Sequence, residues 1–111
     1  GHFYAEVEVN GKKIEFVIDT GATDIVLSEQ DAARLGFPVN DLIYSGRAST
    51  ANGTVPIARI KLDTITIGRF TDSNFSATVN GGELETSLLG MRYLGRYRKI
   101  EIVGSRLTLT R

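Results

Sequence analysis

The chain has 111 residues, 41% of them hydrophobic and 23% charged, which suits one globular domain with its own core. Thirteen basic residues balance thirteen acidic ones, so the sequence lacks the basic excess that is typical of nucleic-acid-binding domains. It contains no cysteine and one histidine, His2. This excludes disulfides and thiol catalysis and argues against a zinc site or a Ser-His-Asp triad. We therefore expect neither a metal nor a cofactor.

The first eighteen residues predict a β-hairpin. Apolar and polar side chains largely alternate over residues 4–9, which is typical of a half-buried strand. Asn10-Gly11 follows and is the strongest two-residue signal for a tight hairpin turn. Residues 12–18 then return as the second strand, and the last three side chains of this strand are all apolar.

A short strand and a short helix are expected next. Residues 24–27 predict a short apolar strand. Ser28, followed three residues later by Asp31, is typical of a helix N-cap. Residues 31–35 favour a helix, and Gly36 suits the position just after its end.

The middle of the chain predicts a second hairpin. A weak strand is expected over residues 42–44. Asn52-Gly53 is another tight-turn signal, and the arms around it, within residues 47–56, carry small, polar or β-branched side chains. These side chains lack the bulk to be buried, so we expect the hairpin to project from the domain. Residues 57–67 continue as a strongly apolar strand.

Shorter elements fill the rest of the chain. We expect a loop at residues 69–73, a strand at 74–79 and an apolar run interrupted by glycine at 87–91. A short helix is expected at 91–94, and two final strands at 99–103 and 107–110. Together the patterns predict about eight or nine short strands and two short helices. This combination indicates an all-β domain whose sheet closes or folds over on itself.

One acidic residue stands at an unusual place, the end of an apolar strand. Asp is depleted in strands and Gly weakens them, yet the strand over residues 12–18 runs directly into Asp19-Thr20-Gly21. A carboxylate with an apolar wall behind it and a tight turn in front is a candidate for chemistry. The alternative is an ordinary turn, because Asp and Gly are common turn residues.

Three motifs together resemble the retropepsin-like aspartic proteases. Residues 19–22 (Asp-Thr-Gly-Ala) are similar to the active-site loop of that family, residues 88–90 (Leu-Leu-Gly) to the element that packs around the loop, and residues 50–53 (Thr-Ala-Asn-Gly) to the flap. The resemblance implies one retropepsin-like domain over residues 1–111, with a closed β fold that equals half of a pepsin-like bilobal enzyme. More closely, the sequence resembles a bacterial branch that carries an N-terminal membrane anchor.

The resemblance implies a peptidase that works as a dimer. Aspartic proteolysis needs two carboxylates that share a proton, because like charges about 3 Å apart cannot both ionise. One acid activates a water, and its protonated partner donates to the scissile carbonyl. Asp-Thr-Gly occurs once in this chain. We therefore expect Asp19 from each of two copies to form the catalytic dyad in a C₂ homodimer that cleaves peptide bonds.

Further site residues follow from the same resemblance. The hydroxyl of Thr20 would brace the partner loop, and Gly21 and Ala22 would leave room for the carboxylate and the substrate backbone. A flap that closes over the substrate would consist of Thr50, Ala51, Asn52, Gly53 and Thr54. The substrate-pocket candidates are Thr23, Asp24, Val26, Leu42, Ile57 and Leu88, and the loop-supporting residues are Leu89 and Gly90. Each apolar pocket candidate has plain core as its alternative role.

The sequence departs from the viral members of the family in its charges and its flap. Those proteins often carry a pair of Asp and Arg where this chain has Thr23 and Met91. Because both charges are absent together, we expect a weaker dimer. The flap is poorer in glycine than the viral flap, which predicts a stiffer flap. Residues 107–110 match the interface strand of the family in pattern.

Two other functions stay open, a catalytically silent binding or dimerisation module of the same fold and an unrelated small β-barrel binding protein. An intact Asp19 argues against the silent module, which needs no carboxylate there. As partners we expect a second copy and a protein or peptide substrate, and no nucleic acid. The resemblance implies a bacterial cell-envelope location, with the domain in the periplasm. Membrane contact would come only from an anchor outside these residues, which contain no apolar run of about 20 residues.

Overall fold

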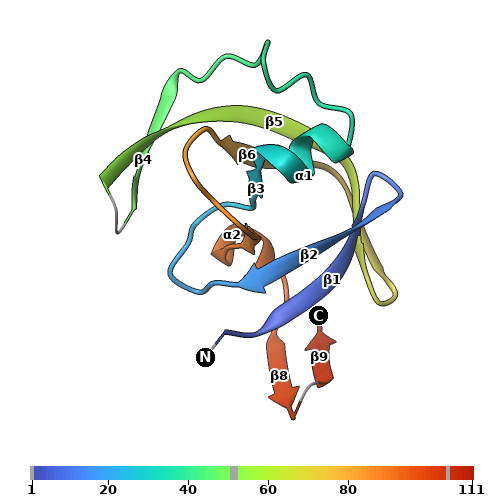
Figure 1. Cartoon of the computed structure of the whole chain (residues 1–111). Coiled ribbons are helices and arrows are strands. Elements are labelled where there is room, and N and C mark those ends of the chain that lie inside the picture. The colour runs from blue at the N-terminus through green and yellow to red at the C-terminus, as the bar shows by residue number, and fades with distance from the viewer. Residues whose placement is uncertain (1, 51–52, 105) are drawn as a thin grey trace.

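Six strands close into a barrel around one hydrophobic core (Figure 1). The computed structural model describes residues 2–50, 53–104 and 106–111. Neighbouring strands follow the order β1-β2-β7-β3-β6-β5, and β1 also pairs with β5, which closes the ring and confirms the closed all-β fold. In chain order the elements are β1 (Tyr4–Val9), β2 (Lys12–Ile18), β3 (Val26–Ser28), α1 (Glu29–Arg34), β4 (Gly46–Thr50), β5 (Gly53–Ile67), β6 (Phe70–Asn80), β7 (Ser87–Leu89), α2 (Met91–Leu94), β8 (Lys99–Val103) and β9 (Arg106–Thr110).

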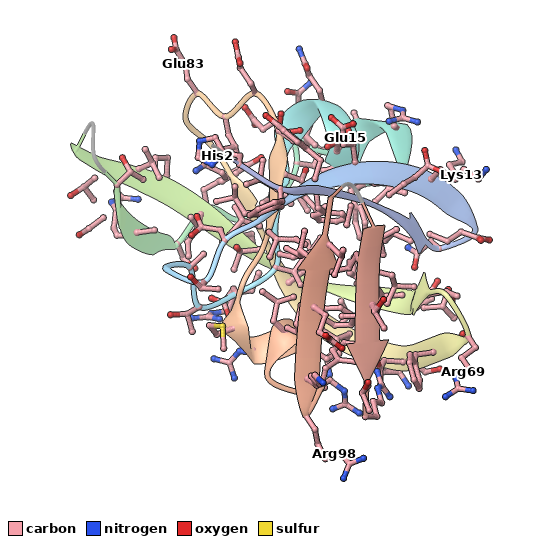
Figure 2. All side chains as sticks on the ribbon, turned by 90° about the horizontal axis from the view of Figure 1, so that it is seen from below. His2, Lys13, Glu15, Arg69, Glu83 and Arg98 are labelled. Atoms are coloured by element: carbon pink, nitrogen blue, oxygen red, sulfur yellow. The ribbon has the colours of Figure 1, made fainter. Side chains whose placement is uncertain are left out.

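The N-terminal hairpin of β1 and β2 forms as the sequence predicts. Asn10 and Gly11 both have a positive φ, 50° and 82°, as a two-residue turn of type I′ requires. The two strands pair antiparallel and bury alternate apolar side chains. The intervening residues face solvent, as Lys13 and Glu15 do in Figure 2. This hairpin delivers the end of β2 to one end of the barrel.

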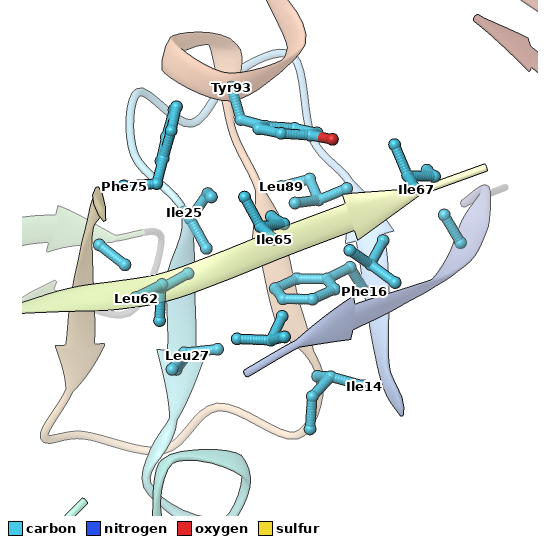
Figure 3. Close-up of a cluster of buried hydrophobic side chains, with 14 of the residues drawn as sticks. Ile14, Phe16, Ile25, Leu27, Leu62, Ile65, Ile67, Phe75, Leu89 and Tyr93 are labelled. Carbon is cyan, nitrogen blue, oxygen red and sulfur yellow. The ribbon is translucent and has the colours of Figure 1, made fainter. Parts of the chain in front are cut away.

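Large apolar side chains from most strands fill the barrel. Figure 3 shows Phe16 of β2, Ile65 of β5 and Leu89 of β7 in one cluster, and all three are fully buried. Tyr93 of α2 covers the cluster, and its hydroxyl is hydrogen-bonded to that of Tyr97. Burial and this hydrogen bond raise the pKa of Tyr93, so the phenol stays neutral. Burial of each large apolar side chain adds roughly 1.5–3 kcal/mol to the stability of the fold. The core thereby holds the loops at the barrel ends in place.

The weak strand expected over residues 42–44 does not form, and this prediction was wrong. The segment between α1 and β4 is irregular there. Tyr44 is anchored by its side chain instead, because its hydroxyl donates to the Glu29 carboxylate (2.8 Å). Burial and this hydrogen bond raise the pKa of Tyr44 to about 12. Side-chain anchoring therefore replaces strand pairing in this segment.

The hairpin of β5 and β6 is longer than the sequence predicts. We expected a loop over residues 69–73, but β6 begins at Phe70, directly after a two-residue turn at Gly68-Arg69. Asn74, the first residue of the expected strand, lies inside β6, where its positive φ of 53° accompanies a break in the pairing ladder. The polar residues Thr71, Asp72 and Ser73 resemble a loop in sequence, whereas in the structure they pair with β5.

Helix α1 begins two residues before the predicted helix, but its N-cap was predicted correctly. The backbone N–H of Asp31 donates to Ser28 Oγ (3.1 Å). Ser87 of β7 joins this cap, because its hydroxyl donates to Asp31 Oδ2 (2.6 Å) and accepts from the Ser28 N–H (3.0 Å). The network fixes the start of α1 against β7, the strand that leads to the candidate site.

The C-terminal hairpin of β8 and β9 forms a separate two-stranded sheet below the barrel, beside the N-terminal end of the chain (Figure 1). The inward-facing Leu107 and Leu109 of β9 pack against the core, which attaches the hairpin to the barrel. Within the described ranges, no helix has both the length and the hydropathy to cross a membrane.

Candidate active site

Asp19 lies directly after β2, where the chain leaves the barrel. β2 runs parallel to β7, and the Asp19 N–H donates to the Leu89 carbonyl (3.0 Å). The side chain is half-buried, and its Oδ1 accepts a hydrogen bond from the Gly21 N–H (2.9 Å). The Ala22 N–H donates to the Asp19 carbonyl (3.2 Å). The turn thus holds one carboxylate oxygen with a backbone donor and fixes the direction of the side chain.

Gly90 allows α2 to approach this loop closely. A Cβ atom at Gly90 would lie 2.3 Å from the Asp24 carbonyl oxygen and 2.8 Å from that of Ala22, closer than such atoms can come. The φ of Gly90 is −94°, so close approach, not backbone conformation, requires glycine here. The first two N–H groups of α2 donate to carbonyls of the same loop (2.9 and 2.7 Å). The residues expected to support the loop therefore lie against it.

An ion pair joins the loop to α2. The Nε of Arg92 lies 2.9 Å from Asp24 Oδ1. Thr23 and Met91 lack the charges that pair in viral members, but a pair of opposite charges is present one residue further along each segment. The sequence reasoning missed Arg92. The available signal was an arginine directly after Met91 together with an acid directly after Thr23.

A cleft of about 530 Å³ opens beside Asp19 and extends across strands β3 to β7. Predicted site residues that line it are Asp19, Gly21, Ala22, Thr23, Asp24, Val26, Thr50, Ile57 and Leu88. Lining residues that the sequence reasoning missed are Arg47, Ala48, Ser49, Arg59, Thr78 and Asn80. The structure therefore brings the acidic loop, the pocket candidates and an arm of the projecting hairpin together around one space.

The other predicted site residues lie away from this cleft or outside the described residues. Thr20 is exposed and does not line the cleft, and neither do Gly53 and Thr54. Leu42 packs against the core, which was its alternative role. The expected flap residues Ala51 and Asn52 fall outside the described ranges. The hairpin arms on either side of them, β4 and the start of β5, pair and project from the barrel (Figure 1).

One wall of the cleft is a row of side chains from four strands. Arg59 of β5 lies opposite Thr78 of β6, and Thr78 is the partner of Val26 in the parallel pairing with β3. Val26 in turn lies opposite Leu88 of β7. Paired residues share a face of the sheet, so these four side chains point the same way. The sequence could not show this row because its members come from distant segments.

Comparison with known proteins identifies the family. Residues 5–96 match the family described as gag-polyprotein putative aspartyl protease. The chain belongs to this family. The uncharacterized protein RP867 of Rickettsia prowazekii is 44% identical over 102 residues, which are 92% of this chain and 44% of that protein. The chain therefore spans less than half the length of this relative.

Solved structures share the fold. A retropepsin-like aspartic protease from Rickettsia conorii matches with a TM-score of 0.83 and 38% identity, over 98% of this chain and 82% of that chain. EIAV protease, solved with the inhibitor HBY-793, matches with a TM-score of 0.73 and 19% identity, over 86% and 88% of the two chains. The retropepsin-like resemblance and fold expected from the sequence are confirmed.

Proposed function

We propose that the chain is one subunit of a dimeric aspartic endopeptidase in which Asp19 from each of two copies forms the dyad. The observation that carries this proposal is the Asp19 carboxylate, which the Gly21 N–H holds beside a cleft of about 530 Å³. Membership of an aspartyl protease family supports the same chemistry. So does the R. conorii structure, which is described as an aspartic protease.

The proposed reaction uses two carboxylates that hold one proton between them. The ionised acid takes a proton from a water molecule, whose oxygen attacks the scissile carbonyl carbon. The protonated acid donates to the carbonyl oxygen, and a tetrahedral intermediate forms. Transfer of a proton to the amide nitrogen then breaks the C–N bond and releases two peptides. Because the pair titrates as a unit, neither copy of Asp19 is permanently the acid or the base.

Surface composition supports a second copy near Asp19. An apolar groove of about 370 Å³ includes Ile18, the residue before Asp19, together with Phe3 and Leu107. Phe3 is 51% exposed, and Tyr4, which also lines the groove, is 55% exposed. Exposed apolar side chains that gather in one patch are typical of protein–protein interfaces. A single chain also carries only half of the dyad, so the occupant that we propose for this groove is another copy of the chain.

The test is cleavage of a denatured protein between pH 3 and pH 8 by the wild-type chain and by Asp19→Asn. We expect wild type to cleave and Asp19→Asn to lose at least about a thousandfold in rate, because the dyad acts as a unit. A pepstatin-like inhibitor should block wild type. Circular dichroism should show the same fold in both proteins, since the two side chains have nearly the same shape.

Two outcomes would contradict the proposal. Equal cleavage by wild type and Asp19→Asn would exclude the aspartic mechanism. No cleavage by a protein that sediments as a stable dimer would favour the alternative, a catalytically silent binding module. Sedimentation is therefore measured at the concentration used for the assay.

The cellular location stays a prediction from the resemblance, which implies the bacterial cell envelope. RP867 is more than twice as long as its matched segment, so it contains sequence without a counterpart in these residues. A membrane anchor outside the present residues is part of the same proposal.

A further inference from the structure

We propose that Arg47 and Arg59 make the cleft selective for peptides that carry Asp or Glu a few residues from the cleaved bond. The inference rests on the proposed peptidase function, because it names the class of peptide that the same cleft accepts. It concerns two residues that the sequence reasoning missed and that line the cleft on β4 and β5.

Arg59 lies at one end of the row of side chains that forms a wall of the cleft. Arg59 lies two residues after Ile57, so both side chains are on one face of β5, and both line the cleft. The row from Arg59 through Thr78 and Val26 to Leu88 crosses three strand spacings. At about 4.8 Å each these span ~14 Å, a distance that an extended peptide covers in about four residues. Leu88 precedes Leu89, whose carbonyl accepts from the Asp19 N–H (3.0 Å), so Arg59 lies at the end of the row that is farther from Asp19.

The charges that line the cleft leave its positive groups without ion-pair partners among the described residues. The charged residues among its described lining are Asp19, Asp24, Arg47 and Arg59. Asp24 is already paired, because the Arg92 guanidinium lies 2.9 Å from its carboxylate. Neither Arg47 nor Arg59 has an ion pair within the part of the chain that the structure describes. Two unpaired guanidinium groups therefore line this space in a chain whose formal net charge is zero.

The guanidinium groups of Arg47 and Arg59 are suited to bind a carboxylate. Arginine presents its N–H donors as a planar fork that fits a carboxylate with two parallel hydrogen bonds. Arg47 donates to the Gly46 carbonyl (3.3 Å), a neutral acceptor that leaves its charge uncompensated, and both arginine residues are exposed. An acidic side chain would gain these bonds, whereas a lysine or arginine on the peptide would meet like charge. The cleft wall thus favours acidic peptides and disfavours basic ones.

The experiment measures binding with turnover removed. The full chain with Asp19→Asn is titrated into fluorescent decapeptides that have an apolar centre. One set carries a single Glu moved along the peptide, and the matched set carries Gln at the same position. We expect Glu to bind about fivefold to tenfold more tightly than Gln at positions three or four residues from the centre. The difference should shrink from 50 mM to 500 mM salt, because exposed charges are screened.

Variants assign this preference to particular residues. Adding Arg59→Gln should reduce the ratio of Gln to Glu dissociation constants to below about twofold, and Arg47→Gln should reduce it in part. Arg98→Gln is the matched control, because Arg98 is exposed, does not line the cleft and points away from the barrel in Figure 2. It should leave the ratio unchanged.

The results separate this inference from the proposed function. Equal binding of Glu and Gln peptides at every position, no binding of any peptide, or a preference that survives Arg59→Gln with Arg47→Gln would each overturn the inference. Selective binding by a protein whose wild type cleaves nothing would support the inference and contradict the endopeptidase. Cleavage by wild type, together with equal binding of Glu and Gln peptides, would support the endopeptidase and overturn the inference.

Discussion

At the residue scale, Gly90 shows how little space separates the acidic loop from α2. A Cβ atom added at position 90 would lie 2.3 Å from the Asp24 carbonyl oxygen, and backbone atoms cannot move aside as side chains can. We predict that Gly90→Ala lowers the free energy of unfolding by about 3 kcal/mol, because over-packing forces the loop away from the barrel. Urea unfolding followed by circular dichroism measures this change.

The matched control for this steric effect is Gly68→Ala. A Cβ atom at Gly68 would meet nothing within 4 Å, but its φ of +58° is unfavourable for alanine. We expect this control to cost about 1 kcal/mol from backbone conformation alone. If both variants lose the same stability, close packing against the loop is not the reason for glycine at position 90.

At the scale of single elements, the C-terminal hairpin is attached to the barrel through Asp72. This residue of β6 is 6% exposed and pairs with Arg96, at 2.8 Å, and with Arg111 directly after β9. The Arg111 guanidinium also lies over the rings of Phe70 and Tyr97. Its hydrogen bond to Asp72 raises the pKa of Arg111, so the guanidinium stays charged. The ion pairs thus connect β6 to the segment after α2 and to the end of β9.

We predict that Asp72→Asn lowers the free energy of unfolding by about 2 kcal/mol. Removing one partner leaves a charge without compensation, but both arginine residues are partly exposed and regain some hydration, so the loss stays below that of a fully buried pair. The midpoint of urea unfolding reports the change. Relative to wild type, the rate of amide hydrogen exchange should increase more in β8 and β9 than in β1 and β2.

Asp63→Asn provides the control, because Asp63 is an exposed acid on β5, the partner strand of β6. Its free energy of unfolding should change by less than about 0.5 kcal/mol. An equal loss in both variants would mean that removal of negative charge in general, and not the ion pairs of Asp72, determines the stability.

At the scale of the whole molecule, the proposed dyad makes activity a property of two chains. We predict that an equal amount of Asp19→Asn chain, mixed with wild type above the dissociation constant of the dimer, reduces total activity to about half. Random pairing halves the number of dimers that contain two wild-type chains. Dimers of one wild-type and one variant chain have an incomplete dyad. Peptide cleavage after equilibration of the mixture is the measurement.

The control for mixing is Asp63→Asn chain, which should add active subunits and raise the total activity. Unchanged activity after addition of Asp19→Asn would show that each chain works alone, and a second acid would then have to be sought within the chain.

The sequence by itself determines the features that depend on near neighbours. The Asn10-Gly11 turn and the Ser28 N-cap are correct because a few adjacent residues define each of them. The retropepsin-like fold was also predicted correctly, because its three motifs occur in order along the chain. The predicted role of Asp19 awaits the mutational test.

Tertiary structure alone decides which distant segments meet. Sequence patterns missed the pairing of Asp24 with Arg92, residues that are 68 positions apart. They also missed that Arg59 joins a cleft wall built by four strands, and they placed a strand at residues 42–44, where Tyr44 is instead held by Glu29. The physical reason is the same in each case. Closure of the barrel chooses the partners of these side chains, and that choice depends on the packing of the whole core.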